Sequence, residues 1–148
     1  MSFGHHKYSA RPVNEHQKAL RYTQTVVNAM IRERDAGKAC ITCEKFLPLS
    51  AGHFKTSTNA ATQYHPHNLH GQCNSCNGYN GGMTWEYGKA IVRMYGEGYD
   101  DFLTTLARPK EIWTTEELEQ LRSAARMGYP VYIQLYKTLR PHHFPIMS

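Results

Sequence analysis

The sequence predicts an α+β fold in a single domain, with helices on either side of a short metal-binding segment. Its 148 residues fall within the usual size of one domain with one core. Apolar residues recur at helical spacing near the start of the chain and over its second half. Between these regions the chain carries all four of its cysteines in two Cys-x-x-Cys pairs, among short apolar runs and turn formers. These observations place β structure and metal ligands in the centre, with helices at both ends.

The first segment, residues 1–13, is predicted to be a flexible tail because it is polar, rich in histidine and interrupted by a proline. The next segment, residues 14–36, is predicted to be a helix. Asn14 and Gln17 fit the capping-box pattern that begins a helix, and Gly37 is well placed to end it. The apolar stripe of this helix comprises Leu20, Thr23, Val27, Met30 and Ile31.

The central segment, residues 37–83, is predicted to form the metal-binding core. Short apolar pieces around a Leu-Pro-Leu-Ser turn favour a β-hairpin over residues 38–54. Residues 55–67 are rich in Thr, Ser, Asn and His and are expected to form a loop. Helical character resumes near Cys73 and breaks at a Gly-Gly pair, so a hairpin, a loop and a short helix would surround the site.

The last segment, residues 84–148, is predicted to be helical and to pack as a small bundle. Thr114 and Glu117 form a second capping-box pattern, and Gly128 with Pro130 marks a break before the last helix. Its apolar stripes are typical of buried helix faces. They comprise Tyr87, Ile91, Met94 and Tyr95; Tyr99, Phe102, Leu103 and Leu106; Leu118, Leu121 and Ala125; and Tyr132, Leu135, Tyr136 and Leu139.

The two cysteine pairs predict a structural zinc site. Zinc favours four tetrahedral thiolate or imidazole ligands, and each Cys-x-x-Cys turn places two sulfurs on one edge of the tetrahedron. Free thiols or a redox pair are the alternative, although a thioredoxin-like motif needs only one pair. Four sulfurs leave no coordination position open for hydrolysis, so any catalytic groups must lie elsewhere. The predicted zinc ligands are Cys40, Cys43, Cys73 and Cys76.

The charge distribution limits the kind of chemistry and the kind of partner. The chain has 17 Lys and Arg against 12 Asp and Glu, a net charge of +5, which suits a polyanionic partner but also fits a mildly basic protein without one. Between Ala36 and Trp85 the only carboxylate is Glu44, so a nuclease site that holds two metal ions with clustered Asp and Glu cannot be built from this segment. The sequence shows no signal peptide or membrane-spanning run, so we expect a cytoplasmic protein with no membrane association.

The residues around the cysteines resemble a known nuclease pattern. Gly-His at 52–53, Asn-Leu-His at 68–70 and Asn77 directly after the last cysteine together resemble the HNH, or ββα-metal, nucleases. Over residues 27–115 the chain is more closely similar to the phage lambda NinG (Rap) recombination nuclease family. The segments that carry this likeness are Val-Asn-Ala-Met-Ile-Arg-Glu-Arg-Asp at 27–35, Cys-Ile-Thr-Cys at 40–43, Ala-Gly-His at 51–53, Asn-Leu-His-x-Gln-Cys-x-x-Cys-Asn at 68–77, Glu-Tyr at 86–87 and Trp-Thr-x-Glu-Glu at 113–117, where x is any residue.

The resemblance implies a zinc-stapled ββα-metal core and a role for three of its residues. It implies that His53 is the general base that activates a water for attack on a phosphodiester, which suits an imidazole with an ordinary pKa near 6.5. It implies that Asn68 holds the loop and orients this base, although an Asn at this place also fits an ordinary helix cap. Asn77 matches a ligand of a catalytic Mg²⁺ or Mn²⁺.

The sequence departs from the HNH pattern at one position. Many HNH enzymes have Asp or His directly before the base as a metal ligand, whereas this chain has Gly52. His70 is the preferred substitute because it falls inside the matched motif, and His65 and His67 are weaker candidates. His70 also fits a role in hydrogen bonding within the fold. The predicted catalytic residues are therefore His53, Asn68, His70 and Asn77, with the last two as cation ligands.

By resemblance, the function is a metal-dependent DNA endonuclease acting on branched recombination intermediates such as Holliday junctions and displacement loops. The resemblance also implies a phage-encoded protein working in the cytoplasm of a bacterial host, and symmetric cutting of a junction would favour a homodimer. Three alternatives stay open: a non-catalytic zinc module that binds nucleic acid, an HNH nicking or restriction nuclease acting on linear duplex, and a zinc-supported protein-interaction domain. Basic residues near the site could contact phosphates without reading sequence; they are Lys38, Lys45, Lys55, Arg21, Arg32 and Arg34.

Overall fold

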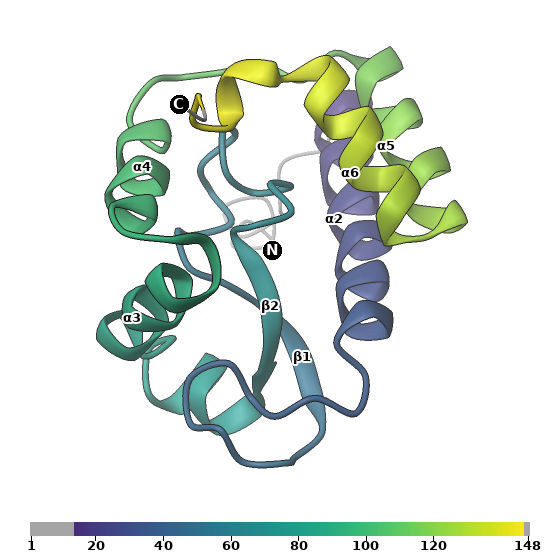
Figure 1. The fold of residues 1–148 in the computed structure, drawn as a ribbon. Helices are drawn as coiled ribbons and strands as arrows, with labels where there is room; N and C mark the ends of the chain where they lie inside the picture. Colours follow the sequence, from purple (N-terminus) through teal and green to yellow (C-terminus); the bar gives the residue numbers. More distant parts are fainter. Residues whose placement is uncertain (1–13, 147–148) are drawn as a thin grey trace, which may run out of the picture.

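A short β-hairpin lies between two groups of helices in the computed structural model, which describes residues 14–146 (Figure 1). The predicted α+β class is confirmed, with helices dominating. The hairpin consists of the antiparallel strands β1 (Leu49–His53) and β2 (Leu69–Cys73). On one side lie α2 (Glu15–Arg34), α5 (Thr115–Met127) and α6 (Tyr129–Leu139), and on the other α3 (Thr84–Tyr95) and α4 (Tyr99–Leu106). Two short turns complete the fold: the π-helical η1 (Ser75–Tyr79) and the 3₁₀-helical η2 (Pro141–His143).

The first helix forms as the sequence predicts and anchors the hairpin. The Gln17 backbone N–H donates to Asn14 Oδ1 at 2.7 Å and the Asn14 N–H donates to Gln17 Oε1, which completes the predicted capping box. At its other end, Arg34 donates to the Leu69 carbonyl at 2.7 Å, and Asp35 accepts the Gly71 N–H at 2.7 Å. The end of α2 is therefore tied to the backbone of β2. The predicted tail, residues 1–13, lies outside the described residues.

The prediction of a β-hairpin over residues 38–54 is wrong. That segment contributes only β1, whose partner β2 follows the loop that we expected over residues 55–67, and the register pairs His53 with Leu69 and Gly52 with His70. All five residues of β2 are buried, although polar and apolar residues alternate in its sequence, Leu-His-Gly-Gln-Cys. Its polar residues His70 and Gln72 bond to other protein groups and do not face solvent. The helical character expected near Cys73 begins two residues later, as the single turn η1.

The two faces of the hairpin pack against different cores. Ala51 and Leu69 share one face and join the core formed with α2, α5 and α6. On the opposite face, the Tyr87 hydroxyl of α3 donates to the Gly52 carbonyl at 2.7 Å. A second core consists of residues of α3 and α4 packed with Phe54, which directly follows β1. The helix residues are Tyr87, Ile91, Tyr99 and Leu103. The helical region after residue 84 is therefore not one bundle, because α3 and α4 lie across the hairpin from α5 and α6.

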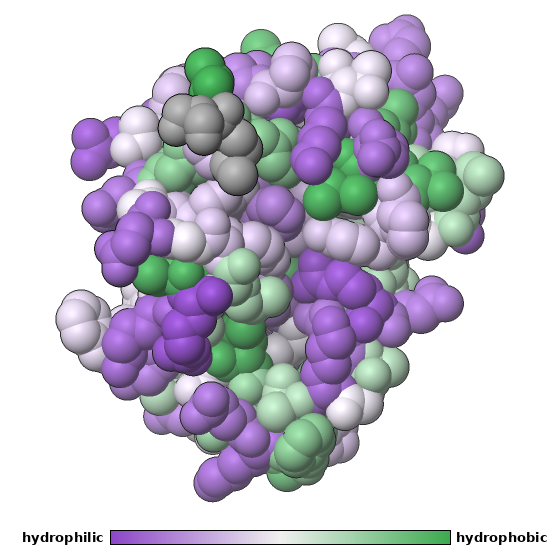
Figure 2. All heavy atoms as spheres, viewed as in Figure 1, coloured by the Kyte–Doolittle hydropathy of each residue, from purple (hydrophilic) through white to green (hydrophobic). Residues whose placement is uncertain are grey.

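The helices bury most of their predicted apolar stripes, but Met94 of α3 is exposed, so its place in the predicted buried stripe is wrong. On the face shown in Figure 2, hydrophilic residues predominate and hydrophobic residues form separate small groups. The capping box predicted for α5 is present, with Thr114 Oγ1 accepting the Glu117 N–H at 3.1 Å. Among the helices of residues 14–146, none combines the length and apolar character that crossing a membrane requires.

Candidate functional site

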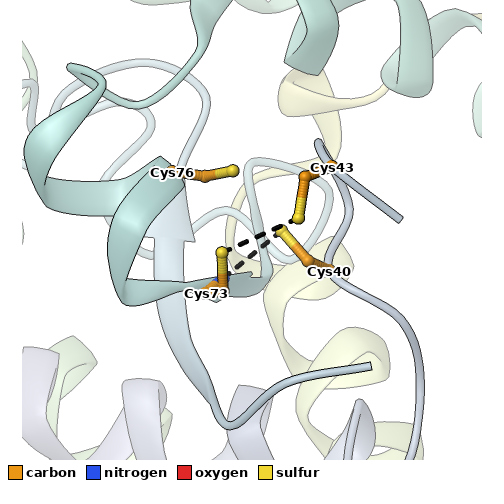
Figure 3. A group of neighbouring side chains, drawn as sticks. All are labelled: Cys40, Cys43, Cys73 and Cys76. Atoms are coloured by element: carbon orange, nitrogen blue, oxygen red, sulfur yellow. Dashed lines mark hydrogen bonds between the residues drawn. The ribbon is translucent and has the colours of Figure 1, made fainter. Parts of the chain in front are cut away.

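The four cysteines meet at the end of the hairpin. Cys40 and Cys43 lie on the turn before β1, Cys73 ends β2 and Cys76 lies in η1, and their sulfurs point toward a common space (Figure 3). All four sulfurs lie within 4.8 Å of one another. Four sulfurs bound tetrahedrally at zinc's usual bond length stand roughly 3.8 Å apart. Cys43 Sγ and Cys73 Sγ are 3.8 Å apart, so the predicted ligand set has the spacing that suits a zinc ion.

The surroundings of the sulfurs favour one thiolate before any cation is bound. Burial opposes ionisation of Cys40, but hydrogen bonds from Thr42 and from backbone N–H groups outweigh it and lower the pKa of this thiol to about 6. Burial raises the pKa of Cys76 to about 12. A divalent cation reverses such a rise, because coordinated thiols are deprotonated. Binding of a divalent cation would therefore convert the remaining thiols of this cluster to thiolate ligands.

His53 occupies the last position of β1, and its ring is held by one hydrogen bond. Nε2 lies 3.1 Å from the carbonyl oxygen of Gln63, which can only accept, so Nε2 carries the proton and Nδ1 keeps a free lone pair. Burial lowers the pKa of His53 below its ordinary value of 6.5. At neutral pH the ring is therefore an uncharged imidazole with Nδ1 available as a proton acceptor.

Asn68 closes the loop that follows His53. Its Oδ1 accepts the Lys55 N–H at 2.8 Å, and its Nδ2 donates to the carbonyls of Lys55 at 3.0 Å and Thr62 at 2.9 Å. The residue is fully buried and precedes a strand, so the alternative of a helix cap does not describe it. These bonds fix the backbone at Lys55, two residues after His53.

The histidines predicted as cation ligands are engaged within the fold. Tyr87 already donates to Gly52, so its hydroxyl accepts from His70 Nδ1 at 3.0 Å, and the Tyr95 hydroxyl donates to His70 Nε2 at 2.7 Å. Nδ1 of His70 therefore carries the proton and the lone pair of Nε2 is occupied by Tyr95, so neither nitrogen is left for a metal, and burial lowers the pKa of His70 to about 3. His65 is fully buried with Nε2 2.7 Å from the His143 carbonyl, and His67 Nδ1 lies 2.6 Å from the Tyr99 hydroxyl. This geometry favours the structural alternative for His70.

Asn77 and most of the predicted phosphate contacts lie at the surface. Asn77 follows Cys76 in η1 and is exposed, as are Arg21, Arg32, Lys38 and Lys45, while Lys55 is half-buried. Arg34 differs, because its guanidinium forms an ion pair with Asp35 at 2.8 Å and its side chain is 13% exposed. Arg34 therefore stabilises the hairpin and is poorly placed to contact a phosphate.

Gln72 lies within the motif that carries the family likeness, but the sequence assigned it no role. It is fully buried in β2, and its Nε2 donates to the Gly82 carbonyl at 2.8 Å and to Thr42 Oγ1 at 3.1 Å. Its Oε1 is buried and has no hydrogen-bond partner among the described residues. This oxygen lies against Gly52, where an added Cβ would stand 2.2 Å from it. The glycine at this position is what makes room for the Gln72 amide.

Replacing Gly52 with alanine should therefore destabilise the hairpin. The new methyl group would overlap Gln72 Oε1 and Cβ, and overpacking of this kind costs roughly 1–3 kcal/mol. Gly88→Ala is a matched control, because its Cβ would meet the Phe54 ring at an ordinary 3.5 Å and alanine favours the helix. Urea denaturation of the zinc-loaded proteins measures both changes. Equal stability of Gly52→Ala and wild type would contradict the close packing of Gln72 on Gly52.

Comparisons with known proteins agree on one family. The family model described as Bacteriophage Lambda NinG protein matches residues 4–129. The chain is 33% identical to Protein ninG of Escherichia phage lambda over 109 residues, which cover 70% of this chain and 52% of that protein. It is 32% identical to Protein ninG of Salmonella phage P22 over 108 residues, with the same shares. The chain thus spans about half the length of these relatives, and no solved structure matches it.

Proposed function

Because the chain belongs to the NinG family of bacteriophage proteins, we propose that it is a metal-dependent DNA endonuclease of the ββα-metal (HNH) type, acting on branched recombination intermediates. One observation carries the proposal: Nδ1 of His53 has no hydrogen-bond partner among the described residues and can accept a proton. His53 is the last residue of β1, in the hairpin whose other end meets the four cysteines. The loop after His53 is closed by Asn68, and the turn carrying Asn77 begins at the cysteine cluster.

In the proposed reaction His53 is the general base. Nδ1 takes a proton from the attacking water while Nε2–H remains bonded to the Gln63 carbonyl, which stabilises the imidazolium that forms. Asn68 keeps the adjacent backbone in place throughout, so the base does not need to be positioned when DNA binds.

The proposed reaction also needs a divalent cation, and Asn77 is the predicted ligand whose side chain is available to it. A bound Mg²⁺ or Mn²⁺ would neutralise the scissile phosphate and stabilise the leaving 3′ oxygen. Asn77 offers an exposed amide oxygen, a hard donor of the type these cations prefer. The four sulfurs suit zinc and would keep a structural ion separate from the catalytic one.

The direct test compares cleavage of a four-way DNA junction with cleavage of a duplex of matched sequence. With Mg²⁺ or Mn²⁺ we expect cutting of the junction in preference to the duplex, and binding that weakens as salt rises through counterion release. Binding without cleavage under all metal conditions would favour the non-catalytic zinc module. Equal cutting of junction and duplex would favour a nicking or restriction nuclease and would overturn the branch-specific part of the proposal.

A further inference from the structure

We propose that a surface pocket between α4 and the end of α6 binds an unpaired base of branched DNA, with a lysine at its edge for the adjoining phosphate. The lining of this aromatic pocket includes His67, Tyr95, Tyr99, Lys137 and Phe144. The inference rests on the proposed function and adds a nucleotide-binding site to it. It is carried by the rings that line the pocket, by the charge around it and by its position at the end of the hairpin.

The aromatic pocket has the size and the wall chemistry that suit a nucleobase. Its volume is about 520 Å³, within the roughly 300–1,000 Å³ typical of ligand pockets. Four of its lining residues carry flat rings, and His67 and Tyr95 are stacked with their ring centroids 4.1 Å apart. Every base has a π-face that stacks on such rings, whatever the sequence. A base inside a duplex cannot reach a pocket, so the fitting ligand is an unpaired base.

The polar atoms of these rings are mostly satisfied within the fold. The Tyr95 hydroxyl donates to His70 Nε2, and the Tyr99 hydroxyl lies 2.6 Å from His67 Nδ1. His67 Nε2 has no hydrogen-bond partner among residues 14–146. It is a donor or an acceptor according to the tautomer, and base edges carry groups of both kinds. The pocket therefore favours stacking over base-specific hydrogen bonds, which predicts a weak sequence preference.

The charge around the aromatic pocket is positive and suits a phosphate. Lys137 is exposed on α6, with Nζ 5.3 Å from the centre of the Phe144 ring. Among the described residues, no Asp or Glu lines the pocket. Burial lowers the pKa of His67 to about 4, helped by the positive charges of Lys137 and Arg34, so its ring is neutral at pH 7. The same positive charges that oppose a second cation at His67 attract the phosphate of a nucleotide.

The aromatic pocket lies at the end of the hairpin where β1 stops. Leu69 is the register partner of His53, and His67 comes two residues before Leu69. Between them, the Asn68 carbonyl accepts the Phe54 N–H at 2.9 Å, which ties this segment to the residue after His53. Both groups of helices contribute, because α3 and α4 supply the tyrosines and α6 supplies the lysine. A base held here keeps its strand next to the segment that carries the proposed general base.

The first test compares two forms of one branched DNA, in which an unpaired nucleotide at the branch point either carries its base or is abasic. Fluorescence anisotropy measures their affinity for the full, zinc-loaded chain without added Mg²⁺ or Mn²⁺. We expect wild type to bind the form with the base roughly tenfold or more tightly, as for stacking of one base on aromatic side chains. Equal affinity of wild type for the two forms would overturn the proposal.

A wall variant and a matched control locate this preference. Phe144→Ala removes one ring of the aromatic pocket and should bind the two DNA forms with nearly equal affinity. Ile146→Ala removes a large apolar side chain two residues later, which is 97% exposed and outside the pocket lining, and should keep the preference of wild type. A full preference in Phe144→Ala would contradict the proposed pocket, as would a loss of the same size in Ile146→Ala.

A second measurement needs no variant and stays valid if Phe144→Ala folds poorly. With 5-iodouracil as the unpaired base, ultraviolet light links the base to an aromatic ring on which it stacks, and mass spectrometry should find the link in the aromatic pocket. Links confined to other residues would overturn the inference. Junction cleavage measured in parallel separates the two proposals. Cleavage by a wild type without preference for the base removes only the pocket, whereas a wild type that neither binds branched DNA nor cleaves it removes both.

Discussion

Cys76→Ser should lose its bound metal and most of its folded stability. Cys76 joins η1 to the turn that carries Cys40 and Cys43, and these short segments have little apolar core of their own. In such a site the free energy of metal binding is free energy of folding. We expect a loss of more than about 4 kcal/mol, a size reached only by a few mechanisms that include removal of a metal.

Metal analysis and denaturation together check this expectation. A denatured wild-type sample should release about one zinc per chain, and a strong chelator should lower the stability of wild type toward that of Cys76→Ser. Ser75→Ala is a suitable control, since Ser75 lies in the same turn, is exposed and offers no thiolate. A wild-type protein that is stable and free of metal after purification would refute the structural zinc.

The elements predicted correctly are those whose signals are local. Capping boxes at Asn14 and Thr114 depend on residues three positions apart, and both helices begin where these boxes predict. The cysteine cluster was predictable for a related reason, because each Cys-x-x-Cys turn fixes two sulfurs locally and zinc chemistry then requires the pairs to meet.

The errors concern contacts between distant segments. The β2 strand has only five residues and a central glycine, so its alternation of polar and apolar residues is a weak strand signal. Its polar residues His70 and Gln72 are buried by contacts with distant segments, which the sequence does not reveal. Whether a histidine such as His70 is free to bind a metal depends on Tyr87 and Tyr95, which follow it by 17 and 25 residues. Whether Arg34 is free to contact a phosphate likewise depends on a distant segment, because its guanidinium donates to the Leu69 carbonyl of the hairpin.

His53→Ala should abolish DNA cleavage while leaving the fold and the DNA affinity almost unchanged. The ring makes one hydrogen bond, to the Gln63 carbonyl, so its removal should cost only about 1 kcal/mol of stability. Loss of a general base lowers a rate by at least roughly 10²-fold. Zinc content, junction binding and junction cleavage of the purified variant measure these effects, with His142→Ala, at an exposed histidine, as the control.

The pH dependence gives an independent check on the same residue. Because burial lowers the pKa of His53, the ring is neutral at pH 7 and gains its proton only in acid. The cleavage rate of wild type should therefore be flat near neutrality and fall as pH decreases, with a midpoint below 6.5. A midpoint well above 6.5 would indicate a different base.

Added metal distinguishes the base from a cation ligand. Asn77→Ala should cut poorly, but raised Mn²⁺ should partly restore its activity by mass action if Asn77 only holds the cation. The same Mn²⁺ should not restore His53→Ala, because the missing function there is the removal of a proton from water by Nδ1. Near-normal cleavage by a folded, metal-loaded His53→Ala protein would exclude the proposed mechanism, whatever the behaviour of Asn77→Ala.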